Sequence, residues 1–102
     1  MTIEWSFRAK TDLQDLHTYI SKDSPYYAKQ FLERIFMAVE KLATHPKMGR
    51  IVPEANREDV RELLFCNYRI MYQLQAKQIF IVTIIHGSRD LSQMESSPWN
   101  IL

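Results

Sequence analysis

The sequence is poor in the residues that cross-link or loosen a fold. Its one cysteine, Cys66, cannot form an internal disulfide, so we expect a reducing compartment. Two glycines and four prolines exclude a low-complexity or loop-dominated chain. No apolar run approaches the roughly 18 residues that cross a bilayer, and the first residues lack the basic and apolar regions of a signal peptide. We therefore expect a cytoplasmic protein with no membrane partner.

A strong excess of charge of either sign is also missing. The formal net charge is +1, so only a local cluster of cations could bind nucleic acid. What is present is the composition of an ordinary globular protein, with 46% hydrophobic and 25% charged residues, enough to bury one core. We predict a single domain over residues 1–102.

Helical periodicity marks the first half of the chain, after a short alternating strand at residues 2–7. One helix is predicted from an N-cap at Ser6 to about Lys22, because Ala9, Leu13, Leu16 and Ile20 form one apolar stripe. A second begins at Ser24-Pro25, where a hydroxyl cap precedes a proline that suits the first helical position. It is predicted to end at His45-Pro46, and the short connection predicts an antiparallel hairpin.

Strand periodicity marks the second half, after a predicted loop over residues 48–59. Three strands are predicted at Val60–Phe65, Tyr68–Leu74 and Gln78–His86, with Asn67 taking a positive φ in the first turn. The β-branched last strand should be buried on both faces. The fold class is therefore α+β in the order β-α-α-β-β-β, with the helical hairpin on one face of a small, mostly antiparallel sheet.

Cationic side chains gather in the second half of the chain. The candidates for binding a phosphate or a target are Arg50, Arg57, Arg61, Arg69 and Arg89. Pairing of the strands could bring Arg61, Arg69, His86 and Arg89 to one side of the sheet, where guanidiniums would bind phosphates or the carboxylates of an acidic partner. Alternatively, the arginines are solvated or pair with nearby acids: Glu58, Asp59, Glu62 and Asp90.

His86 is the one candidate for proton transfer, since it ends a strand and can titrate near neutral pH. It could equally be a capping or packing histidine. His17, His45 and His86 lack the spacing of metal ligands, so we predict no metal and no cofactor. Tyr72 lies on an alternating strand, and we expect it in the core rather than stacked on a base.

The ordered motifs of the chain resemble the RelE/ParE superfamily of toxins. The matching segments span most of the sequence: Ala9-x-x-x-Leu13-x-x-Leu16-x-x-x-Ile20, Asp23-Ser24-Pro25-x-x-Ala28-x-x-Phe31, Leu42-x-x-x-Pro46-x-x-Gly49-Arg50, Arg61-Glu62-Leu63, Tyr68-Arg69-Ile70-x-Tyr72 and His86-Gly87-Ser88-Arg89-Asp90-Leu91. The resemblance implies a type II toxin that is neutralised by a co-expressed antitoxin. Arg61, Arg69 and Arg89 match basic positions of the family.

The resemblance implies one of two activities. ParE-like members bind and poison DNA gyrase, whereas RelE-like members cut mRNA on the ribosome without a metal, for which His86 would be the catalytic residue here. RelE-type chains often carry a tyrosine soon after the closing motif, where this chain has Ser92. That difference, the small net charge and the His-Gly-x-Arg-Asp form favour the ParE-like activity. A non-toxic binding module of the same fold is the further alternative.

Overall fold

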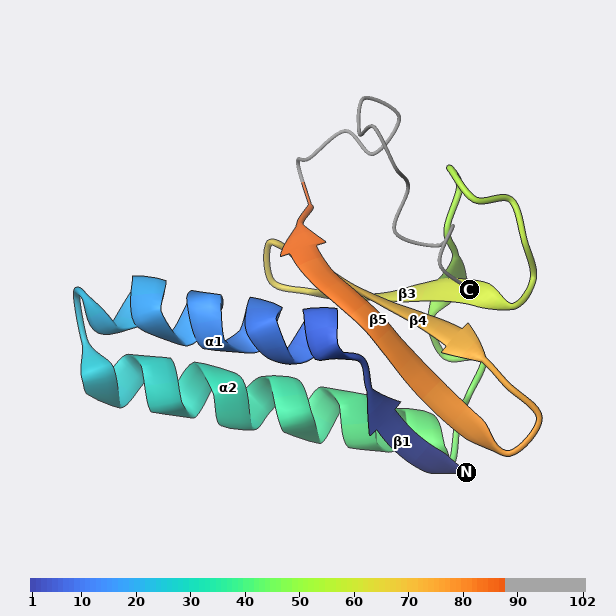
Figure 1. Ribbon diagram of the computed structural model, residues 1–102, viewed down its shortest axis with the longest axis horizontal. Helices are drawn as coiled ribbons and strands as arrows, with labels where there is room; N and C mark the ends of the chain where they lie inside the picture. The colour runs from blue at the N-terminus through green and yellow to red at the C-terminus, as the bar shows by residue number, and fades with distance from the viewer. Residues whose placement is uncertain (88–102) are drawn as a thin grey trace.

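A computed structural model describes residues 1–87 as two layers, a helical hairpin packed on one face of a sheet (Figure 1). None of the helices in this range is long and apolar enough to span a bilayer. The elements follow in the order β1 (Thr2–Trp5), α1 (Phe7–Ser21), α2 (Pro25–Glu40), a 3₁₀ turn η1 (Lys41–Ala43), β2 (Arg50–Ile51), β3 (Val60–Phe65), β4 (Tyr68–Leu74) and β5 (Gln78–His86).

The sheet has five strands in the order β1-β5-β4-β3-β2. Only β1 runs parallel to its neighbour β5, and the other three pairings are antiparallel. The three long strands β5, β4 and β3 lie inside the sheet, and the short strands β1 and β2 form its edges. The predicted fold class and the three long strands are thereby confirmed, with the same residue bounds.

Each helix begins where the sequence predicts. The Ser6 hydroxyl accepts the backbone N–H of Ala9, and the Ser24 hydroxyl accepts that of Tyr27. The second helix differs slightly from the prediction, because its regular part ends at Glu40 and continues as η1 before Pro46. The 3₁₀ geometry is a common way for the last turn of a helix to tighten.

Two apolar clusters cover the two faces of the sheet. The larger lies under the helices, where the buried side chains of both predicted stripes meet the sheet at Ile70, Tyr72 and Ile79. The smaller lies on the opposite face, where Val52 from the β2–β3 loop covers Met71. We call these the helix face and the outer face of the sheet. Tyr72 is fully buried, as predicted for a core residue.

Two local predictions are wrong. Residues 48–59 are not all loop, because Arg50–Ile51 pairs with β3 as a fifth strand that is too short to show a period in sequence. In the β3–β4 turn the positive φ of 51° belongs to Cys66, not to Asn67. The turn itself lies where it was predicted, at Cys66-Asn67, but its first residue takes the left-handed conformation that asparagine usually favours.

The two helix caps differ in what else their hydroxyls do. Ser6 is buried and also donates to the carbonyl of Val82 in β5, whereas Ser24 makes only the cap. We expect Ser6→Ala to lower the free energy of unfolding by about 2 kcal/mol and Ser24→Ala by about 1 kcal/mol or less. Urea denaturation of both variants measures this, and equal losses would contradict the additional role of Ser6.

Candidate functional site

The outer face of the sheet carries a buried carboxylate. The side chain of Glu62 in β3 is 0% exposed. It accepts Nε–H of Arg69 from β4 at 2.5 Å and Nε–H of Arg50 from β2 at 2.6 Å. Removing a carboxylate from water costs several kcal/mol unless partners replace the lost hydration. The two guanidiniums supply those partners, so Glu62 joins the three strands β2, β3 and β4.

Arg69 also binds a second carboxylate. Its two terminal nitrogens donate to the two oxygens of Glu54, each at 2.9 Å, in the bidentate geometry that suits guanidinium and carboxylate. The Arg69 side chain is only 7% exposed. We call Arg50, Glu54, Glu62 and Arg69 the Arg–Glu cluster. Because it contains two cations and two anions, its formal net charge is zero.

The charges of the Arg–Glu cluster stabilise one another. The hydrogen bonds from Arg69 lower the pKa of the Glu54 carboxyl below its ordinary value, although partial burial of that carboxyl acts in the opposite direction. The same bonds, together with the one to Glu62, raise the pKa of the Arg69 guanidinium. Both groups therefore stay ionised at neutral pH, and Arg69 is occupied by two partners.

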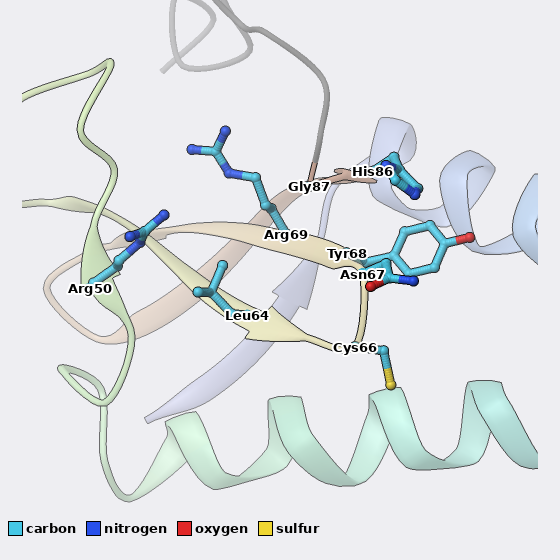
Figure 2. Close-up of a pocket in the computed structure, with 8 residues that line it drawn as sticks. All are labelled: Arg50, Leu64, Cys66, Asn67, Tyr68, Arg69, His86 and Gly87. Atoms are coloured by element: carbon cyan, nitrogen blue, oxygen red, sulfur yellow. The ribbon is translucent and has the colours of Figure 1, made fainter.

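A cavity of about 370 Å³ opens at the end of the sheet, next to the β3–β4 turn (Figure 2). Arg50, Arg69, Tyr68 and His86 are among its lining residues. In Figure 2 the guanidinium of Arg69 points away from His86. The imidazole instead meets the ring of Tyr68 edge-on, with 5.6 Å between the centroids. Cations and imidazole thus border the same cavity, but they belong to different faces of the sheet.

The predicted grouping of Arg61, Arg69 and His86 on one side is wrong. Arg61 lies opposite the buried Tyr72, which belongs to the helix face, whereas Arg69 lies opposite Leu64 and shares the outer face with Glu62. Arg61 donates instead to the backbone carbonyls of Gly49 and Glu58. The strands alternate as predicted, but the pairing register, which sequence alone did not supply, separates the two arginines.

The remaining predicted cations lie apart from the cavity or outside the described range. Arg57 forms a bidentate pair with Asp59, at 3.1 and 2.8 Å. Arg89 lies beyond residues 1–87, so its position is not described. The alternative that the arginines pair with neighbouring acids is confirmed for Asp59 and Glu62. Sequence reasoning missed Glu54, because it sits in an aperiodic loop that brings it to β4 only through tertiary packing.

Loss of Arg69 should lower the free energy of unfolding of the protein itself, in the absence of any target. Replacing Arg69 by Met leaves Glu54 without its partner and the buried Glu62 with Arg50 alone, and we expect a loss of about 3 kcal/mol. The matched change Arg57→Met removes a half-exposed surface pair and should cost at most about 1 kcal/mol. Chemical denaturation compares the two, and equal costs would contradict the structural role of Arg69.

The lowered pKa of Glu54 predicts a pH dependence of stability. A carboxyl with a folded-state pKa below its ordinary value of about 4.3 stabilises the fold fully above that pH. This contribution, about 1 kcal/mol for a partly exposed group, is lost as the pH falls through the folded pKa. Glu54→Gln should therefore be less stable than the parent at pH 7 and equal to it in strong acid. Urea denaturation across this pH range measures the difference, and a gap between Glu54→Gln and the parent that stays constant with pH would contradict the prediction.

Sequence comparisons identify relatives over most of the chain. Residues 3–91 match the family model described as the ParE toxin of the type II toxin-antitoxin system parDE. The putative toxin Y4kP of Sinorhizobium fredii is 32% identical over 94 residues, covering 90% of this chain and 94% of Y4kP. Toxin RelE2 of Caulobacter vibrioides is 32% identical over 87 residues, covering 85% of this chain and 96% of RelE2.

Structural comparisons find the same fold. A chain of the chromosomal ParDE toxin-antitoxin system from P. aeruginosa superimposes with a TM-score of 0.71 at 22% identity, over 84% of this chain and 95% of that one. A chain of the RelBE2 toxin-antitoxin complex from Mycobacterium tuberculosis gives a TM-score of 0.57 at 20% identity, over 83% and 95%. At these identities the likeness establishes the fold.

Proposed function

This chain belongs to the ParE toxin family of type II toxin-antitoxin systems, and we propose that it arrests growth by binding DNA gyrase. It binds its target as a protein surface and carries out no cleavage of its own. The observation that carries the proposal is the neutral Arg–Glu cluster, in which two carboxylates of this chain hold Arg69 and leave it no free donor for a phosphate.

Phosphate binding by Arg69 would have to disrupt the Arg–Glu cluster. Arg69 donates its Nε–H to Glu62 and both terminal nitrogens to Glu54. An RNA phosphate would have to displace Glu54, and it would approach a cluster with no net charge. With a chain net charge of only +1, long-range attraction to the ribosome is also weak. Both features support a protein target over an RNA substrate.

The position of His86 points the same way. A general acid or base must lie within hydrogen-bond reach of the atom it protonates, while cations hold the adjacent phosphate. Here the imidazole packs on Tyr68 at the helix face, and the Arg69 guanidinium points away from it at the outer face (Figure 2). The two halves of an RNA-cleaving site are therefore not assembled.

Arg50 is the arginine of the cluster that remains accessible, with 57% of its side chain exposed. We propose it as a contact for the target, with Arg57 as a second exposed cation. Arg61 and Arg69 hold neighbouring segments in place through their hydrogen bonds to Gly49 and to Glu54 and Glu62. Arg89 remains a candidate contact on the sequence alone. A cognate antitoxin would neutralise the toxin in the cytoplasm, and the whole chain of residues 1–102 would act as one domain.

One observation favours ribosome-dependent mRNA cleavage as a second candidate. Arg50, Arg69 and His86 border one cavity, and a relative with 32% identity bears the name RelE2. In this alternative His86 is the catalytic residue, and the phosphate is bound by Arg61 and by Arg69, the latter after the target has displaced Glu54. The alternative requires a rearrangement of the Arg–Glu cluster.

Purified gyrase and purified ribosomes separate the two candidates. We expect the isolated chain to inhibit gyrase supercoiling at stoichiometric amounts and to leave ribosome-bound mRNA intact. His86→Ala should still arrest growth when induced without an antitoxin, whereas Arg50→Ala should weaken gyrase inhibition several-fold. Arg8→Ala, a change on α1 outside the cavity, is the control.

Cleavage of ribosome-bound mRNA that disappears in a folded His86→Ala variant would overturn the gyrase proposal in favour of the second candidate. A parent chain that neither arrests growth nor affects gyrase or mRNA would favour the non-toxic binding module.

A further inference from the structure

The strand that ends in His86 is irregular. Met71 of β4 lies opposite Thr83, and the next residue, Tyr72, lies opposite Ile81, so Val82 of β5 has no partner on β4. Such a β-bulge shifts the alternation of side chains along the bulged strand. Before it, Ile79 and Ile81 belong to the helix-face cluster; after it, Ile84 does.

The bulge decides on which face His86 lies. Ile85 belongs to the outer-face cluster, and His86 lies opposite Tyr68 with its ring against the tyrosine. With regular alternation from Ile79 onward, His86 would lie on the outer face, beside Arg69. One residue of register therefore separates an imidazole that packs on Tyr68 from one that joins the Arg–Glu cluster.

The apolar pattern of β5 does not select between these registers. Residues 79–85 read Ile-Phe-Ile-Val-Thr-Ile-Ile, and regular alternation would place Thr83 and Ile85 on the helix face where Ile84 and His86 now lie. Because Ile84 and Ile85 would only exchange faces, the isoleucine area buried on each face would hardly change. Some other interaction must therefore fix the register at this end of the strand.

That interaction comes from the start of α1. β1 ends at Trp5 opposite Ile81, so within residues 1–87 no strand pairs with the rest of β5 on that side. Ser6 donates its backbone N–H to the carbonyl of Ile81 and its hydroxyl to that of Val82. Asp12 accepts the hydroxyl of Thr83 and, at 2.9 Å, the backbone N–H of Ile84.

We propose that Asp12 is a positioning residue, which selects the bulged register of β5 and thereby holds His86 at Tyr68, away from the Arg–Glu cluster. Backbone N–H groups of a strand alternate between its two sides, so Ile84 presents its N–H to Asp12 only in the observed register. The register claim stands without the proposed function. The functional meaning of this register, that His86 is kept away from the arginines of the cluster so that no cleavage site forms, rests on the proposed function.

Nuclear Overhauser contacts of the His86 ring test the proposal in the full chain. The parent should show contacts between His86 and Tyr68. Asp12→Ala should lose them in a substantial fraction of molecules, which should show contacts of His86 with Arg69 and Leu64 instead. Asp12→Asn, whose amide oxygen can accept both hydrogen bonds, should keep the parent contacts.

Asp15→Ala is the matched control, one turn further along α1, because Asp15 forms no hydrogen bond or ion pair within residues 1–87. If Asp12→Ala does not fold, Thr83→Val is measured in its place. Thr83→Val removes one of the two donors to Asp12 and keeps the side-chain volume. A second set of His86 signals is expected there. A single parent-like set of contacts in Asp12→Ala, or in Thr83→Val if that variant replaces it, would overturn the proposal, whatever the gyrase assay shows.

Discussion

The buried carboxylate of Glu62 constrains the whole outer face of the sheet. A fully buried anion must be paired, and only residues from neighbouring strands can reach it. Arg69 and Arg50 meet this need, which fixes β4 and the short β2 to β3. Arg69 is then itself nearly buried, so Glu54 is drawn from its loop to complete the pairing. One buried charge thus sets the packing of three strands and a loop.

The same constraint links the fold to the function. Arg69 is a candidate cation in the sequence, but the carboxylates of Glu54 and Glu62 already occupy it in the fold. In the folded protein, neighbouring carboxylates neutralise much of the positive charge of Arg50, Arg57 and Arg69. What remains accessible, Arg50 above all, suits a contact with a protein surface better than a grip on a phosphate.

The sequence predicts the elements of this fold well and their relative register poorly. Helix caps at Ser6 and Ser24 and the three long strands follow from local chemistry, which acts within a few residues. The two-residue strand at Arg50 does not, since it exists only because β3 and Glu62 lie beside it. The bulge at Val82 is likewise invisible in an almost continuous apolar run, because its cause lies seventy residues away at Asp12.

The arginines of the Arg–Glu cluster are satisfied by the carboxylates of the cluster, and we expect that Arg69 does not receive phosphate. Arginine side-chain resonances, recorded while a short single-stranded RNA is titrated into the full chain, test it most directly. We expect the Nε–H signal of Arg69 to be protected from solvent exchange and to stay in place throughout the titration. A saturable shift of Arg69 together with His86 would contradict the account.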